Sequence, residues 1–255
     1  MSVLGLHDLT IAQGGQPLCR GLTLSVGPGE AWLVLGENGS GKSTLLATLA
    51  GWHAPAQGHV ALHGKPQAEW PARERARRQA WLSQQDDCPF PISVLEKVLT
   101  GRHPYLGRWD WESSADLDLA RQQLARLDLA ALEARDLATL SGGERRRVGL
   151  ATALAQQASL LLLDEPLSQL DLRHQQQALA VLREERASGR SLVVVSHDPN
   201  HARSFASHAL LLYGDGRWLA GPLGETLTTA TLSALYHHPV RALADDGGTW
   251  FVPGT

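Results

Sequence analysis

Short apolar runs separated by glycine-containing turns fill the first part of the chain. Three of these runs, at residues 4–12, 18–26 and 31–35, have the length and composition of β-strands. After a glycine cluster, residues 43–50 contain good helix formers and no proline, which predicts a helix. The pattern therefore predicts a strand, a glycine-rich loop and a helix in succession, a layout that suits phosphate binding.

The pattern becomes helical between residues 94 and 157, with strong helix formers at 116–127 and 144–157. Strand-like runs return at 160–164 and 191–196, and a helical segment at 172–187 lies between them. This alternation is typical of a parallel α/β sheet. We therefore expect one compact unit, in which residues 1–85 and 158–255 form the core and residues 86–157 form an inserted helical subdomain.

Composition narrows the class of protein. Of the 255 residues, 43% are apolar and 19% are charged, an ordinary globular balance, and the net charge of −3 does not favour free nucleic acid as the main partner, although a local basic patch stays possible. Cys19 and Cys88 lie far apart without metal-type spacing, which fits a reducing compartment. The N-terminus does not have the pattern of a secretory signal, and the apolar runs are far shorter than a membrane-spanning helix. We expect a cytoplasmic protein whose membrane association is peripheral.

The sharpest motif lies between the predicted strand and helix. Eight residues fit the pattern G-x-x-x-x-G-K-[ST]: Gly36, Glu37, Asn38, Gly39, Ser40, Gly41, Lys42 and Ser43. Thr44 follows them and is also a candidate for binding. Glycines let backbone amides surround phosphate oxygens, the lysine neutralises the β- and γ-phosphate charge, and the serine hydroxyl is a ligand for Mg²⁺. The alternative, a glycine-rich turn with an incidental lysine, does not explain the flanking strand and helix.

Two carboxylates end the predicted strand at 160–164. Asp164 and Glu165 follow four leucines, and Pro166 stops regular strand pairing. Asp164 is a candidate to complete the magnesium shell, and Glu165 is a candidate to orient and deprotonate an attacking water. By itself the run could be an ordinary core strand with a solvated end. Beside a phosphate loop it predicts nucleotide hydrolysis.

A second anion site is predicted before the helix at 144–157. Ser141 can cap this helix, and Gly142, Gly143 and Glu144 follow it. Leu140 to Glu144 resembles the signature motif of the ATP-binding cassette (ABC) ATPases, and the resemblance runs from the first strand to about Tyr236. It implies a P-loop NTPase core with a parallel sheet, an N-terminal antiparallel β subdomain and the helical insertion. It also implies a head-to-tail dimer that encloses two ATP molecules with Mg²⁺, because the signature motif completes the site of a second copy.

Other residues match the family in the expected order. Gln84, with Gln85 as the alternative register, resembles the glutamine that contacts Mg²⁺ and water and links the core to the helical subdomain. Asp171 lies in a segment that resembles the loop crossing the dimer interface, and His197 resembles the switch histidine near the γ-phosphate. Many members stack an aromatic residue on adenine near the end of the first strand, where this chain has Gln13. Loss of such a stack costs on the order of 1–3 kcal/mol, so we expect weaker adenine recognition.

One segment indicates a branch of the family. The sequence Gly101-Arg102-His103-Pro104-Tyr105 resembles that of cassettes serving importers of iron siderophores, heme and cobalamin. In that branch the stretch between Val94 and Trp111 lies near the groove for the membrane permease. Its aromatic residues could anchor a permease helix or could instead pack inside the helical subdomain. The arginines at 73–78 are interpreted as a solvated helix face, and the scattered histidines as surface or turn residues rather than metal ligands.

The resemblance predicts an ATPase that powers import of a metal chelate from the cytoplasmic face of the membrane, with a substrate-binding protein as an indirect partner. A soluble cassette ATPase acting on DNA is an alternative, but such relatives carry a long coiled coil or a zinc module that this chain lacks between residues 44 and 140. A regulatory module without turnover is another alternative, which Gln13 alone favours. Measured ATP hydrolysis and its stimulation by DNA would discriminate these readings.

Overall fold

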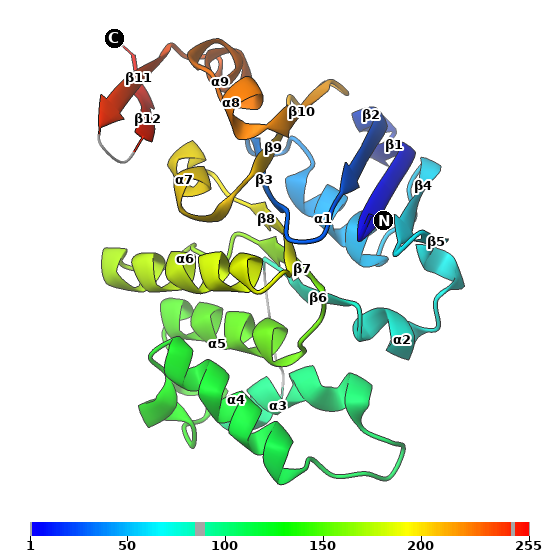
Figure 1. The fold of residues 1–255 in the computed structure, drawn as a ribbon, viewed down its shortest axis with the longest axis vertical. Coiled ribbons are helices and arrows are strands. Elements are labelled where there is room, and N and C mark those ends of the chain that lie inside the picture. Colours follow the sequence, from blue (N-terminus) through cyan, green and yellow to red (C-terminus); the bar gives the residue numbers. More distant parts are fainter. Residues whose placement is uncertain (1, 85–89, 246–247, 255) are drawn as a thin grey trace.

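The computed structural model describes residues 2–84, 90–245 and 248–254 (Figure 1). Its largest sheet has six strands in the order β10-β9-β3-β8-β7-β6. The pairs from β6 to β9 are parallel, and β10 joins the edge antiparallel to β9. The strand bounds are β3 Ala31–Gly36, β6 Gln79–Leu82, β7 Leu160–Asp164, β8 Ser191–Val195, β9 His208–Leu212 and β10 Trp218–Pro222.

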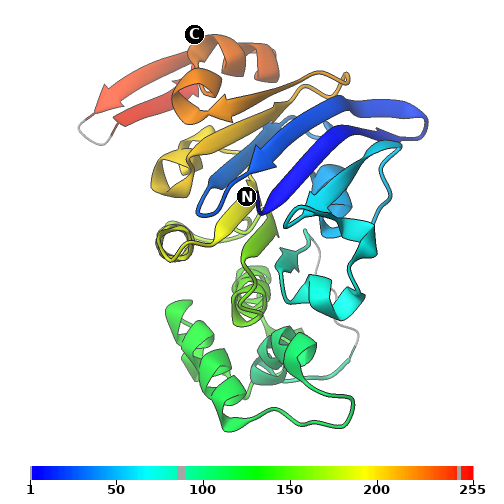
Figure 2. The same ribbon diagram turned by 45° about the vertical axis from the view of Figure 1, so that its right-hand side comes forward.

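A second, antiparallel sheet has the order β2-β1-β4-β5. Its strands are β1 Leu4–Gln13, β2 Gln16–Val26, β4 Gln57–Leu62 and β5 Lys65–Pro66. Figure 2 shows β1 and β2 crossing in front of the central sheet. Helix α1 (Lys42–Ala50) shares one apolar core with both sheets, because its Leu45, Leu46 and Leu49 pack with residues of β1, β3 and β8.

The central strands are buried on both faces, as expected when helices cover a parallel sheet. In β7, Leu160 and Leu162 belong to the core on the α1 side, whereas Leu161 and Leu163 belong to the core formed with the helices of the other side. Because strand side chains alternate between faces, Asp164 continues the row that faces α1. The register of β7 thus directs Asp164 toward the phosphate loop.

The helices of the second core follow β6 and β7 in the chain (Figure 1). Between those strands lie α3 Val94–Leu99, α4 Ser114–Arg126 and α5 Gly142–Ala155, which pack against one another. The long helix α6 Leu172–Ala187 connects β7 to β8. None of the helices in the described ranges is long and apolar enough to cross a bilayer.

The last part of the chain adds small elements beyond β8. These are α7 Ala202–Phe205, α8 Leu223–Thr226, α9 Thr229–Tyr236 and an antiparallel hairpin of β11 Val240–Asp245 and β12 Gly248–Pro253. A short helix, α2 Ala72–Ala76, precedes β6. The hairpin and α9 lie together at the end of the molecule opposite α3 and α4 (Figure 1).

The predicted α/β fold with an antiparallel N-terminal sheet is confirmed. The predicted bounds of β7 and α6 match the structure, and those of β1, β3 and α1 differ by one residue. The arginines at 73–78 were expected on a solvated helix face, but two of them make hydrogen bonds to another part of the chain. Arg73 and Arg77 both donate through Nε to the carbonyl of Pro104, at 2.8 Å each. These bonds fix α2 to the segment after α3.

Candidate functional site

The phosphate loop connects β3 to α1, as the sequence predicts. The nine binding residues predicted for this motif run from the last residue of β3 to the first turn of α1: Gly36, Glu37, Asn38, Gly39, Ser40, Gly41, Lys42, Ser43 and Thr44. Gly41, just before the helix, has a φ of 97°, and a Cβ there would lie 2.8 Å from the Cβ of Leu18. Only glycine satisfies both the left-handed backbone and the close approach of β2. The resulting turn presents backbone amides at the N-terminus of α1.

Lys42 is buried in this loop at 5% exposure. Its Nζ donates to the carbonyl oxygens of Gly36 at 2.8 Å and Glu37 at 2.9 Å. Burial lowers the pKa of Lys42, and the carboxylates of Glu165 and Asp164 oppose that change. The lysine is therefore oriented by neutral carbonyls, which phosphate oxygens can replace as stronger, charged partners.

Asp164 supplies a buried acceptor beside the loop. It is 2% exposed, and its Oδ1 has no hydrogen-bond partner among the described residues. Burial raises the pKa of Asp164, while a hydrogen bond from the Ser43 hydroxyl acts in the opposite direction. A carboxylate and a hydroxyl oxygen beside a phosphate site are the donors that Mg²⁺ prefers. These residues therefore fit the predicted metal, with the amide oxygen of Gln84 as the third predicted ligand.

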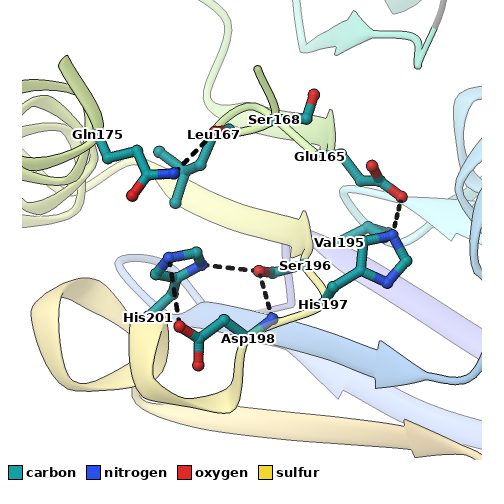
Figure 3. A pocket seen from close by; sticks show the side chains of 9 residues that line it. All are labelled: Glu165, Leu167, Ser168, Gln175, Val195, Ser196, His197, Asp198 and His201. Carbon is teal, nitrogen blue, oxygen red and sulfur yellow. Dashed lines mark hydrogen bonds and ion pairs between the residues drawn. The ribbon is translucent and has the colours of Figure 1, made fainter. Parts of the chain in front are cut away.

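Glu165 does not continue the alternation of side chains along β7, because its backbone leaves the extended conformation. Its φ is 52°, in the left-handed region that non-glycine residues rarely adopt. The Glu165 Oε1 accepts from His197 Nε2 at 2.5 Å and from Gln84 Nε2 at 3.4 Å. Figure 3 shows the Glu165 carboxylate meeting the His197 ring at the carboxyl ends of β7 and β8. The structure thus brings together three residues that lie far apart in the sequence. Gln85, the alternative to Gln84, lies outside the described residues.

Arg146 is a site residue that the sequence analysis missed. From the second turn of α5, its Nε donates to the backbone carbonyl of Glu165 at 3.0 Å. Its second nitrogen donates to the carbonyls of Ser83 at 2.6 Å and Gln84 at 3.2 Å. The signal in the sequence was a basic residue within the predicted helix at 144–157. The structure shows that this residue is buried, which is rare for arginine unless its charge is paired. This guanidinium joins α5 to the two chain segments that carry Glu165 and Gln84.

The predicted signature residues begin α5. Ser141 caps the helix, since its Oγ accepts from the amide of Glu144 while the Glu144 carboxylate accepts from the amide of Ser141. A Cβ on Gly143 would lie 2.7 Å from the carbonyl oxygen of Gln169, and Gly142 likewise faces the Gln169 side chain. The exposed Ser141 and the amides after it therefore form a possible anion site that packs against the loop before α6.

These residues do not join the phosphate loop of their own chain. Among the described residues, no hydrogen bond connects Ser141 or Glu144 to residues 36–44. Asp171 caps α6 through the amide of His174 at 2.9 Å, and Gln13 is exposed as the last residue of β1. The nucleotide contacts predicted for the signature segment and Asp171 stay predictions, as does the weakened recognition of adenine at Gln13.

The stretch between Val94 and Trp111, which indicated the importer branch of the family, contains residues with two different roles. Arg102 is buried in an ion pair with Asp116, and the Tyr105 hydroxyl donates to the carbonyl of Gln156 at 2.9 Å. These side chains hold the helices together. Trp109 and Trp111 are 85% and 88% exposed. The two tryptophans therefore do not fill the helical core, the alternative that the sequence left open.

The fold and the site define an ATP-binding cassette. The family model of the ABC transporter matches residues 19–168, so the chain belongs to this family and is an ATPase. The hemin import ATP-binding protein HmuV of Streptomyces coelicolor is 42% identical over 235 residues, which cover 91% of this chain and 82% of that protein. The HmuV of Gloeobacter violaceus is 44% identical over 234 residues, covering 89% and 84%.

A solved structure gives the same result for the fold. A metal-chelate type ABC transporter in an inward-facing conformation superposes with a TM-score of 0.85 at 31% identity. The match covers 100% of this chain and 98% of that one. The likeness therefore includes the region beyond residue 168, where the family model ends.

Proposed function

We propose that this chain is the ATP-hydrolysing subunit of an importer for a metal chelate, with heme as the substrate class that the relatives favour. The observation that carries the hydrolytic role is the Glu165 carboxylate, which accepts from His197 and Gln84 beside a phosphate loop. The support for heme is the hemin import function named for relatives at 42% and 44% identity. Siderophores and cobalamin are the other chelates of this branch.

The site residues have distinct tasks in this proposal. Lys42 and the amides of the loop bind the β- and γ-phosphates, while Ser43, Asp164 and Gln84 hold Mg²⁺. When bound, Mg²⁺ neutralises charge that develops on the phosphate oxygens. Glu165 orients the attacking water and accepts its proton. His197 holds the Glu165 carboxylate through Oε1 and, as the family resemblance implies, would lie near the γ-phosphate of bound ATP.

Two copies are needed to complete each site. We place the Ser141–Gly143 amides and Asp171 of one copy across a head-to-tail interface from the phosphate loop of the other. Two observations support this arrangement: Ser141 and Asn38 are exposed, and among the described residues no hydrogen bond joins Ser141 or Glu144 to the phosphate loop of the same chain. ATP binding then draws the copies together, and hydrolysis releases them, which shifts the population between closed and open dimers. The helical subdomain at 86–157 moves with respect to the core formed by residues 1–85 and 158–255.

The dimer binds membrane permease subunits at the cytoplasmic face and drives them, with a substrate-binding protein as the indirect partner. We place the permease contact between Val94 and Trp111, where Trp109 and Trp111 expose large apolar surfaces. Replacing both tryptophans by alanine should abolish co-purification with the permease while the melting temperature stays unchanged. The matched variant with phenylalanine at both positions should still co-purify with the permease. Undiminished co-purification of the alanine variant would refute this contact.

The substrate class is tested with the assembled transporter in proteoliposomes. ATP hydrolysis is measured with hemin, cobalamin or a ferric siderophore supplied with the substrate-binding protein. The proposal predicts stimulation by hemin and none by the other two chelates. Stimulation by cobalamin or the siderophore alone would reassign the substrate, and DNA-stimulated hydrolysis by the isolated chain would support the soluble alternative.

A further inference from the structure

The loop that carries His197 has its own hydrogen-bond network. Ser196 Oγ is 2.8 Å from His201 Nδ1 and accepts from the Asp198 amide at 3.2 Å, and Asp198 Oδ1 accepts from the Asn200 amide at 2.8 Å. Figure 3 shows these side chains on one side of the loop and the His197 ring on the other, next to Glu165. The network shapes residues 196–201 but leaves the His197 side chain 51% exposed. Apart from its bond to Glu165, the position of the His197 ring therefore depends on the backbone of this loop.

The C-terminal hairpin is bonded to this loop by a pair of hydrogen bonds. The side-chain amide of Asn200 donates to the carbonyl of Phe251 at 3.0 Å, and its oxygen accepts from the Phe251 amide at 2.8 Å. Next to it, the Arg203 guanidinium lies 4.0 Å from the centre of the Trp250 ring. Asn200 thus pairs with β12 as a neighbouring strand would, through a donor and an acceptor that are both used. The partly buried Phe251 packs against the core, so the hairpin has a fixed base.

A second contact reaches the loop from the end of α9. The Tyr236 hydroxyl donates to the backbone carbonyl of His197 at 3.4 Å. Burial raises the pKa of Tyr236 to about 12, and the nearby carboxylates of Asp198 and Glu37 act in the same direction. The phenol therefore stays protonated and able to donate at physiological pH. The C-terminal segment thus contacts the loop at two positions, His197 through Tyr236 and Asn200 through Phe251.

We propose that Asn200 and Tyr236 are positioning residues for ATP hydrolysis, through which the C-terminal segment, residues 229–253, fixes the loop that presents His197 to Glu165. This inference rests on the proposed roles of His197 and Glu165. A small displacement of a group that orients the reacting water lowers turnover strongly. None of these three hydrogen bonds involves a residue of the phosphate loop, so their loss is expected to lower turnover more than ATP binding.

The test uses the purified full-length chain with Asn200→Ala and Tyr236→Phe made separately. Each variant should lower kcat for ATP hydrolysis by about tenfold and change KM for ATP by less than about twofold. Ser233→Ala is the matched control. It removes a 2.8 Å hydrogen bond from the Val240 amide inside the same C-terminal segment and does not touch the loop. The control should lower the melting temperature to a similar extent and leave kcat unchanged.

Hydrogen exchange provides a second measurement that does not depend on turnover. Without nucleotide, amides of residues 196–201 should exchange faster in Asn200→Ala and Tyr236→Phe than in the wild-type chain or Ser233→Ala. Exchange in α1 should be the same in all four proteins. Unchanged kcat in both variants would overturn the inference, as would unchanged loop exchange in both or a rise in KM without loss of kcat.

Failure of the proposed function would give a different result. Glu165→Gln, which leaves the C-terminal contacts intact, should abolish hydrolysis if Glu165 has the proposed role. Full activity of that variant would refute the site itself. Loss of activity in Glu165→Gln together with normal activity of Asn200→Ala and Tyr236→Phe would refute only the role of the C-terminal segment.

Discussion

The buried ion pair of Arg102 and Asp116 is expected to stabilise the helical subdomain. Arg102 Nε is 2.8 Å from Asp116 Oδ1, and the two side chains are 10% and 12% exposed. Asp116 also accepts from the hydroxyl and amide of Ser113 at the start of α4. A second Arg102 nitrogen donates to the carbonyl of Ala155 at the end of α5. Replacing Asp116 by asparagine removes the charge that these donors surround.

The size of the effect follows from the titration of the carboxyl. Hydrogen bonds from Ser113 and Arg102 lower the pKa of Asp116 from 3.8 to about 2. At about 1.4 kcal/mol for each pKa unit, the folded state favours the carboxylate over its neutral form by roughly 2 kcal/mol. Because the folded pKa is lowered, this stabilisation is fully present above pH 3.8 and is lost as the pH falls toward 2. At neutral pH, Asp116→Asn should therefore lower the melting temperature by roughly 4–8 °C.

The assay is thermal and urea unfolding of the two proteins at pH 7. Glu133→Gln is the matched control, since it removes an exposed ion pair with Arg121 at 3.0 Å, which is worth under about 1 kcal/mol. Equal melting temperatures of Asp116→Asn and the wild-type chain would refute the reasoning. So would a loss in Glu133→Gln as large as that in Asp116→Asn.

Three further predictions concern the site and its surroundings. Asp164→Asn should raise the Mg²⁺ concentration needed for half-maximal hydrolysis by at least about tenfold, and an unchanged Mg²⁺ titration would remove Asp164 from the metal shell. Gly143→Ala puts a Cβ 2.7 Å from the Gln169 carbonyl, so we expect a lower melting temperature and a loss of hydrolysis, both measured on the purified chain. Burial lowers the pKa of His201 below 6.5, so the unfolded chain binds that proton more tightly and stability should fall as the pH drops through 6.5 and below. His201→Gln should make the melting temperature less dependent on pH between 7.5 and 5.5, and an identical slope would contradict this assignment.

The elements that the sequence predicted best are those whose local pattern agrees with their place in the fold. The four leucines before Asp164 are buried on both faces of β7, and the uninterrupted helix formers of α6 lie between two predicted strands. The glycine-rich loop was recognisable in the sequence because the spacing of its glycines determines the backbone conformation of the loop. The positions of Gln84 and His197 followed from their order relative to these motifs.

Other parts of the site depend on contacts between distant segments. The left-handed backbone of Glu165 has no local signal, because glycine or asparagine is the usual residue there. The role of Arg146 depends on carbonyls 19 to 63 residues away. Asn200 is joined to its partner by the packing of the C-terminal hairpin, and Tyr236 by the packing of α9, neither of which any motif indicated. Tertiary packing determined these positions, so local patterns did not contain them.

Crosslinking between two copies tests the central claim most directly. One chain carries Asn38→Cys and the other Ser141→Cys, both in a Glu165→Gln, Cys88→Ser background. Cys19 is buried with its pKa raised to about 12, which keeps its thiol protonated and unreactive. The account predicts a crosslink between the two chains that forms only with ATP and disappears when Lys42→Ala is added. A crosslink that forms equally without ATP, or none between the chains with ATP bound, would contradict it.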